Sequence, residues 1–164
     1  MSEREPSSPA IEAAEAAGIG YRLVHHGHVN SAEEAAEKRG IEIGQLAKTL
    51  VVRVDEDRYV LVLVPGDAGM DYKKLRSHLG VRRLSMPDPD EAFRATGYRR
   101  GTITPLGSGR PAILDTRLLG YAEISLGAGV PEWAIHLDPA DLVEAFDVTV
   151  GDVARDASEE ADAG

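Results

Sequence analysis

Residues 48–64 of this chain read KTLVVRVDEDRYVLVLV, two β-rich runs joined by a polar turn. The first run is Lys48–Val54, the second is Tyr59–Val64, and the acidic residues 55–57 between them predict the turn. Side chains alternate between the two faces of a strand, and both faces of the second run are apolar. We therefore expect an interior strand that is covered on both sides. One face carries Val60, Val62 and Val64, and the other carries Tyr59, Leu61 and Leu63.

Around this hairpin the sequence alternates helical and strand patterns without a repeat or a linker, which predicts one mixed α/β domain over residues 11–155. We expect disorder in residues 1–10 and in the acidic segment from Asp152 on, with residues 156–164 outside the domain. The expected helices are Pro9–Ala17, a helix that Ser31 caps and that runs to Arg39, Asp71–Leu79, Pro89–Ala95 and a last helix that Asp138 caps; the expected strands are Tyr21–His25, Val81–Leu84, Ala112–Leu114, Tyr121–Ser125 and Trp133–Leu137.

Composition limits the class of protein. The chain has 164 residues, 43% hydrophobic and 28% charged, which is typical of a globular domain with its own core. It contains no cysteine, which excludes disulfides, thiolate metal sites and a cysteine nucleophile. No apolar run is long enough to span a bilayer, and residues 1–10 lack the apolar core of a signal peptide. We therefore expect a cytoplasmic protein without membrane contact.

Charge is distributed unevenly along the chain. The formal net charge is −10, but residues 73–110 contain nine basic and three acidic side chains, a local net charge of +6 that leaves −16 for the remainder. A basic stripe on an acidic body can bind a polyanion locally. The same pattern also fits a solvated surface with ordinary use of lysine and arginine.

Three features could carry chemistry. Lys48 begins a row of otherwise apolar side chains, so it either anchors an anion at the mouth of a pocket or caps an exposed strand end. The Gly/Pro loop Gly101–Pro105 can present free backbone N–H groups to a carbonyl oxygen, or is a plain connection. The small-residue loop Gly127–Gly129 either lines the same pocket or is an ordinary turn.

Other site types lack their motifs. In the cluster of His25, His26 and His28, only His26 and His28 would share a face of a strand, and no third ligand has metal-site spacing, so we expect no metal. The sequence has no GxSxG nucleophile motif, no phosphate loop and no GxGxxG motif, so we expect no cofactor. A hydrolase of this sequence would activate water or use a hydroxyl group of its own substrate.

The order and spacing of several short motifs resemble the YbaK/prolyl-tRNA-synthetase-associated family over residues 11–155. That likeness implies a single mixed α/β domain with a central, barrel-like β-sheet flanked by helices. The motifs are His26 before the first family helix, Lys48-Thr49-Leu50, Asp71-Tyr72-Lys73-Lys74-Leu75, Thr96-Gly97-Tyr98 followed by Gly101 to Gly107, Asp115, Gly127-Ala128-Gly129, and Asp138 to Leu142.

Members of that family hydrolyse tRNA charged with the wrong amino acid, especially tRNA for proline carrying Cys or Ala. The resemblance implies that Lys48 anchors the 3′-terminal nucleotide and that the backbone at Gly101 holds the ester carbonyl, with mischarged tRNA and prolyl-tRNA synthetase as partners and a monomer as the expected state. It assigns substrate contacts to His26, Thr49, Thr102, Ile103, Thr104, Pro105, Gly127, Ala128 and Gly129. The basic window then assigns tRNA contacts to Lys73, Lys74, Arg82, Arg99 and Arg100.

The sequence departs from the family pattern at the pocket wall. Gly127 and Ala134 stand where the Cys-specific members have Ser and Asp, and Thr102 stands where the loop often has Gly. We therefore expect a small substrate side chain, Ala or Ser, rather than Cys. Two alternatives stay open: a non-catalytic module that binds tRNA 3′ ends or a synthetase, and a small-molecule esterase that would leave the basic window unexplained.

Overall fold

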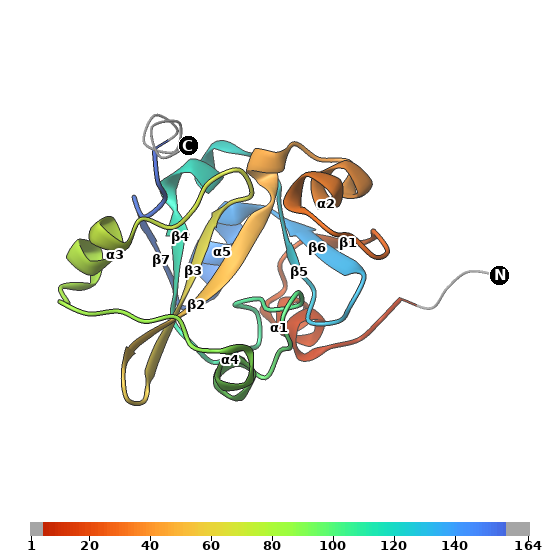
Figure 1. Cartoon of the computed structure of the whole chain (residues 1–164). Helices are drawn as coiled ribbons and strands as arrows, with labels where there is room; N and C mark the ends of the chain where they lie inside the picture. The colour runs from red at the N-terminus through yellow and green to blue at the C-terminus, as the bar shows by residue number, and fades with distance from the viewer. Residues whose placement is uncertain (1–4, 157–164) are drawn as a thin grey trace.

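The computed structural model describes residues 5–156, and the predicted hairpin lies in the larger of its two β-sheets (Figure 1). Strands β2 (Ala47–Asp55) and β3 (Arg58–Pro65) pair antiparallel, with Lys48 opposite Val64. On its other side β3 pairs in parallel with β4 (Ala112–Asp115), which pairs in parallel with β7 (Val148–Gly151). The order β2-β3-β4-β7 makes β3 an interior strand, as its two apolar faces predict.

The two faces of β3 enter two different hydrophobic clusters. Leu61 and Leu63 pack into the larger cluster, which fills the space between the two sheets. Val62 and Val64 pack into a second cluster beneath α3 (Tyr72–Leu79). All four side chains are fully buried, so β3 is the wall that the two clusters share.

A second, three-stranded antiparallel sheet stands beside the first. Its order is β1-β6-β5, from Tyr21–His25, Trp133–Leu137 and Ile124–Gly127. One parallel bridge between Leu46 and Ser125 connects it to the start of β2. The expectation of a barrel-like central sheet is corrected here, because this single bridge leaves two open sheets and no closed barrel.

In the described part of the chain, five α-helices surround the sheets (Figure 1). Helix α2 (Ala32–Arg39) covers the three-stranded sheet, and α5 (Pro139–Ala145) buries Leu142 in the larger cluster. Helices α1 (Pro9–Ala17) and α4 (Pro89–Thr96) contribute mostly alanines to the same cluster. Within the described residues, no helix is long and apolar enough to cross a membrane. Each helix begins at a side chain that accepts a backbone N–H: Ser8, Ser31, Asp71, Asp88 and Asp138.

Several sequence-based boundaries were wrong. The strand expected at 81–84 does not form, because Arg82 and Arg83 are exposed and only Ser85 bridges to Arg53. The strand expected at 121–125 begins at Ile124, since a 3₁₀ turn (η2, Thr116–Gly120) occupies the preceding residues. Strand β7 was not expected at all.

The ordered part of the chain is also longer at both ends than expected. Ser8 caps α1 and is buried, which contradicts disorder up to residue 10. Val153 and Ala154 are fully buried, which contradicts disorder from Asp152 on and agrees with a domain that runs to residue 155. Residues 1–4 and 157–164, where disorder was also expected, lie outside the described residues.

Asp115 fixes this C-terminal segment. Its carboxylate is fully buried at the end of β4 and accepts hydrogen bonds from the backbone N–H groups of Val153 and Ala154, each at 3.0 Å. It also accepts from the backbone and the guanidinium of Arg117. The Asp that the family pattern places after this strand thus lies against backbone amides and one arginine of its own chain.

We predict that Asp115→Ala lowers the free energy of unfolding by about 3 kcal/mol, because buried N–H groups lose their acceptor. The matched control is Asp138→Ala, which removes an exposed helix cap and should cost about 1 kcal/mol. Urea unfolding of both variants measures the difference, and equal losses would show that the buried carboxylate has no special role.

Candidate active site

The candidate site begins where β2 meets β5. The bridge between Leu46 and Ser125 is parallel, so the two strands leave it in the same direction. Lys48 and Gly127 each follow two residues later, at the same end of the junction. Lys48 is half-buried, and the apolar side chains Leu50 and Val52 that share its strand face pack into the cluster beneath α3.

The backbone of Gly127 touches the Gly101–Pro105 loop. A Cβ atom at Gly127 would lie 3.0 Å from the carbonyl oxygens of both Thr102 and Ile103, closer than almost any real Cβ contact. Two residues on, the N–H of Gly129 donates to the carbonyl of Thr102 over 3.2 Å. The structure therefore brings together the two loops that the sequence marked as one candidate pocket.

The loop is braced from its own side as well. Thr102 is buried, and both its N–H and its hydroxyl donate to the carbonyl of Arg99. The Tyr98 hydroxyl donates to the carbonyl of Leu106 over 2.6 Å, and burial raises the pKa of Tyr98 to about 12. Thr104 is fully buried, and its hydroxyl accepts from the N–H of Leu106. Both threonine hydroxyls of this loop thus take part in hydrogen bonds with the loop's own backbone.

This bracing leaves backbone donors unused. In the part of the chain that the structure describes, the N–H groups of Gly101, Ile103 and Thr104 donate to no acceptor. Gly101 is exposed and Ile103 is half-buried. Fixed N–H groups of this kind can stabilise a carbonyl oxygen as negative charge develops on it.

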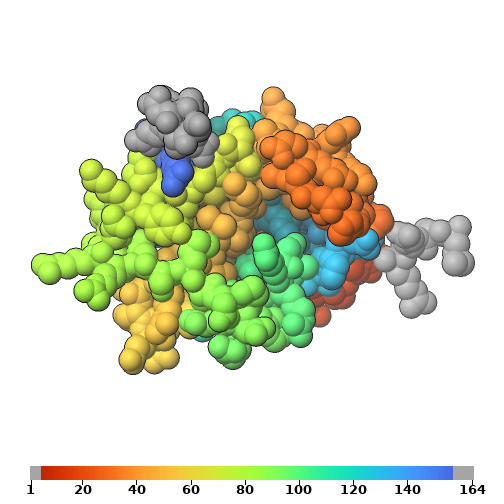
Figure 2. All heavy atoms as spheres, in the orientation of Figure 1, coloured from red at the N-terminus to blue at the C-terminus, as the bar shows by residue number. Residues whose placement is uncertain are grey.

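A cavity of about 310 Å³ adjoins the loop. Thr49, the residue after Lys48, lines it together with Ile103, so β2 and the loop share a wall. On the visible face, a hollow lies between α2, β2 and the loop, and atoms of β5 form its floor (Figure 2). The remaining lining residues of the cavity are Leu50, Val51, Met86, Pro87, Pro89, Ala92 and Arg100.

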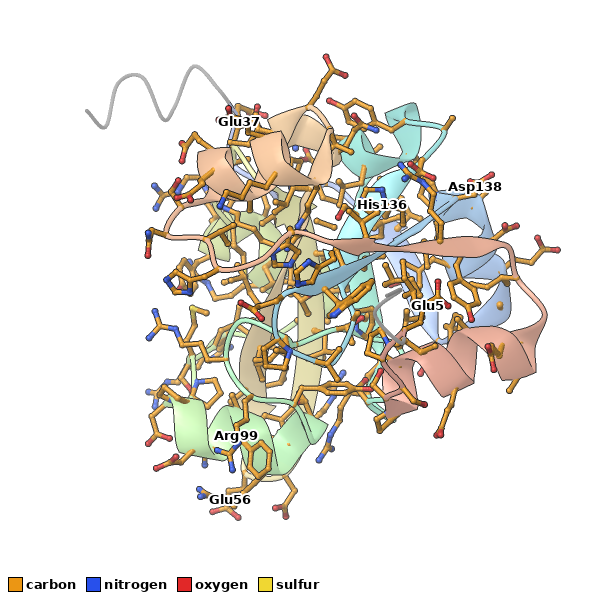
Figure 3. The ribbon with its side chains drawn as sticks, turned by 90° about the vertical axis from the view of Figure 1, so that its right-hand side faces the viewer. Glu5, Glu37, Glu56, Arg99, His136 and Asp138 are labelled. Atoms are coloured by element: carbon orange, nitrogen blue, oxygen red, sulfur yellow. The ribbon has the colours of Figure 1, made fainter. Side chains whose placement is uncertain are left out.

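Two further groups around the site escaped sequence reasoning. The hydroxyl of Ser8 donates to the carbonyl of Ala128 over 2.6 Å, so the N-terminal segment holds the Gly127–Gly129 loop. Beneath α2, Nη1 of Arg39 donates to the hydroxyl of Ser125 over 3.0 Å, and His136 is fully buried in the same layer (Figure 3). A helix-terminal arginine and a strand histidine carry no signal in the sequence that they will meet.

His26 belongs to this second group rather than to the loop. It is half-buried, and burial together with the charge of Arg39 lowers the pKa of its imidazole. Its Nδ1 lies 2.7 Å from the carbonyl of Gly27, whereas Nε2 of His28 lies 3.1 Å from the amide oxygen of Asn30. Within residues 5–156, no three His, Asp or Glu side chains gather as a metal site would require.

The basic residues proposed for tRNA contact have different surroundings. Lys73, Arg82 and Arg100 are exposed. Arg99 is also exposed and stacks over Phe93 of α4, 4.4 Å from the ring centroid (Figure 3). Lys74 differs from them: its ammonium donates to Asp152, Asp156 and the carbonyl of Ala154, and so it holds the C-terminal segment.

Comparison with known proteins agrees with this geometry. The model of the family described as "Aminoacyl-tRNA editing domain" matches residues 26–145. The chain belongs to the aminoacyl-tRNA editing domain family. The matched range contains β2, both loops and the cavity, so the resemblance inferred from the sequence is confirmed.

Named relatives of this editing domain include stand-alone and fused proteins. It is 34% identical to the multifunctional Ser/Thr-tRNA deacylase ProXp-y of Escherichia coli, over 77% of this chain and 79% of that protein. It is 33% identical to a proline–tRNA ligase of Thermosipho melanesiensis over 60% of this chain, which spans only 17% of the ligase. A crystal structure of a candidate trans-editing enzyme for prolyl tRNA synthetase superposes with a TM-score of 0.82 and 31% identity, over 93% of this chain and all of that one.

We predict that Gly129→Ala destabilises the editing domain more than Gly109→Ala does. Both glycines have a positive φ, 81° and 71°, where a side chain costs about 1–2 kcal/mol. Only at Gly129 would the new Cβ meet a neighbour, 2.8 Å from the Tyr98 ring, whereas Gly109 faces open space. We expect this crowding to add about 1–3 kcal/mol in urea unfolding. Equal destabilisation would mean that the Gly129 loop is not pressed against Tyr98.

Proposed function

We propose that this chain is a trans-acting aminoacyl-tRNA deacylase that hydrolyses the ester bond of tRNA charged with a small, wrong amino acid. The observation that carries the proposal is the contact between Gly127 and a braced loop with unengaged N–H groups, beside strand β2 on which Lys48 lies. Such a site supplies a cation and hydrogen-bond donors, which suit an anionic substrate that carries a reactive carbonyl.

The reaction follows from that arrangement. The ammonium of Lys48 pairs with a phosphate at the tRNA 3′ end and positions the terminal ribose. The ester carbonyl oxygen accepts hydrogen bonds from the loop amides, which stabilise the negative charge as a water molecule attacks the carbonyl carbon, and a neighbouring ribose hydroxyl can position that water. The bond between the carbonyl carbon and the ribose oxygen then breaks, the ribose oxygen takes up a proton, and the amino acid is released.

The wall opposite the loop favours a small side chain. Gly127 leaves no space for a side chain of its own, and Ala134, its cross-strand partner, is fully buried. The departures from the Cys-specific pattern therefore remain consistent with Ser or Ala as the amino acid removed. The similarity to a Ser/Thr-tRNA deacylase supports the same class.

We assign the tRNA body to the exposed basic residues near the site, Arg99 and Arg100 first, with Lys73 and Arg82 further along the surface. The matching segment of a proline–tRNA ligase supports tRNA for proline as the carrier and that synthetase as a partner. We propose the cytoplasm, where tRNA is charged, as the place of the activity. His26, Thr49 and Pro105 stay proposed substrate contacts.

A panel of mischarged tRNAs tests the function. We expect the protein to deacylate tRNA for proline carrying Ser or Ala well above the spontaneous rate, and to leave correctly charged prolyl-tRNA intact. Release of radiolabelled amino acid measures both. Tight tRNA binding without turnover would favour the non-catalytic module instead. Hydrolysis of simple esters that does not depend on tRNA would favour the esterase.

Lys48→Ala should lower deacylation by about 10²- to 10³-fold, the effect of removing one positioned electrostatic group. Its thermal unfolding should stay near that of the wild type, because the side chain is half-buried at a strand end and adds little to either core. Lys48→Arg should restore only part of the activity, since a planar guanidinium does not replace a compact ammonium. Undiminished turnover by Lys48→Ala would reduce Lys48 to an ordinary strand-end lysine.

A further inference from the structure

Between α2 and the three-stranded sheet lies Arg39, a half-buried cation that forms no ion pair with any described residue. Arg39 lies at the C-terminal end of α2, and burial lowers the pKa of its guanidinium to about 10, so it is still charged at neutral pH. Its only described hydrogen bond goes to the neutral hydroxyl of Ser125. Its Nε is buried and, among the described residues, has no partner. A buried donor left without an acceptor is costly, which points to a ligand.

A second unpaired atom lies in the same layer. His136 is the cross-strand partner of Ser125, and its Nδ1 lies 3.3 Å from the carboxylate of Glu123. Burial, then the charge of Arg22, lowers the pKa of His136, so the ring is neutral at pH 7. The neighbouring carboxylate favours the proton on Nδ1, which leaves Nε2 as an acceptor. Within the described chain that Nε2 is buried and unpartnered.

One unused donor and one unused acceptor suit a hydroxyl group. A hydroxyl accepts a hydrogen bond through its oxygen and donates one through its proton. A methyl group can do neither, and a thiol does both weakly. The pair formed by Arg39 Nε and His136 Nε2 therefore matches the side chain of Ser or Thr better than that of Ala or Cys.

The position of Arg39 fits a substrate held at the loop. Ser125 and Gly127 alternate onto one face of β5, opposite His136 and Ala134 of β6. Arg39 contacts Ser125 of the cross-strand pair Ser125–His136, and the loop contacts Gly127 of the pair Gly127–Ala134. Two residues along a strand span about 7 Å, close to the distance from a seryl carbonyl carbon to its hydroxyl plus one hydrogen bond of about 3 Å.

We propose that Arg39 is a specificity-determining residue that donates to the side-chain hydroxyl of a misacylated Ser or Thr. The inference rests on the proposed deacylase function and deepens it, because it names hydroxyl amino acids as the substrate class. The hydroxyl in turn donates to His136.

The test compares one tRNA charged with Ser or with Ala. Wild-type protein should deacylate seryl-tRNA at least about 10-fold faster than alanyl-tRNA, the scale of one hydrogen bond to a charged group. Arg39→Met keeps the bulk and removes the donors, and should lower kcat/KM for seryl-tRNA by about 10- to 100-fold. Its effect on alanyl-tRNA should stay within about 3-fold. The matched control is Lys38→Met, the exposed neighbour in α2, which should change neither rate.

Arg39→Lys tests the role of Arg39 even if Arg39→Met does not fold. Lysine retains the charge but lacks Nε, so the preference for Ser should still shrink. A binding measurement separates recognition from chemistry: adenosine carrying a 3′-seryl amide should bind more tightly than its alanyl analogue, and Arg39→Lys should narrow that difference.

The outcomes distinguish failure of the proposed deacylase function from failure of the proposed role of Arg39. Wild-type protein that deacylates neither tRNA would refute the proposed function. Equal losses on both tRNAs in Arg39→Met, or an unchanged Ser preference in Arg39→Lys, would make Arg39 a structural residue and would leave the deacylase standing.

Discussion

Burial of β3 on both faces is the constraint on which the rest of this fold depends. A strand with leucines on one face and valines on the other must lie inside a sheet, with separate apolar layers on its two sides. That requirement places α3 and the C-terminal segment on one side and the second sheet on the other. It also makes β2 an edge strand beside β3, because β4 occupies the opposite flank. The free edge of β2 is where the site forms.

In the proposed site, backbone N–H groups of the Gly101–Pro105 loop supply most of the hydrogen bonds to the substrate. Such groups stabilise a transition state only if the loop is rigid. Three contacts hold the loop: the close approach of Gly127, the hydrogen bond from Gly129 and the buried Tyr98 hydroxyl. The two hydrogen bonds occupy the carbonyl oxygens of Thr102 and Leu106. The amides that remain are fixed in place before the substrate arrives, which is the condition for stabilising charge in a transition state.

The local sequence pattern predicted the interior strand and several helix starts. The double apolar alternation of Tyr59–Val64 predicted its interior position, and Ser31, Asp71 and Asp138 predicted helix starts through their own side chains. Strand β7 was missed because its short exposed alternation gains its stability only from pairing with β4.

At the candidate site, fewer residues could be predicted from the sequence. Lys48 and the Gly/Pro loop stood out because their residue types conflict with their surroundings or demand special backbone. Lys74 was placed among the tRNA contacts because a local charge window does not reveal Asp152 and Asp156, about 80 residues away in sequence. Arg39 and His136 were missed for the same reason, since neither is unusual on its own element and only the packing of α2 on the sheet makes them neighbours.

The small residues Gly127 and Ala134 and the charged residue Arg39 have complementary roles in the proposed selection of the amino acid. Gly127 and Ala134 remove side-chain volume next to the loop, which on its own would admit any small amino acid and separate Ala from Ser weakly, because a pocket distinguishes such isosteres by shape only poorly. Discrimination then requires a polar group whose pairing depends on the substrate. Arg39, one residue pair further along the same sheet face, meets that requirement, because its buried Nε still lacks an acceptor among the described residues. In the proposed site, Gly127 and Ala134 thus limit the size of the substrate side chain, and Arg39 selects for a hydroxyl group on it.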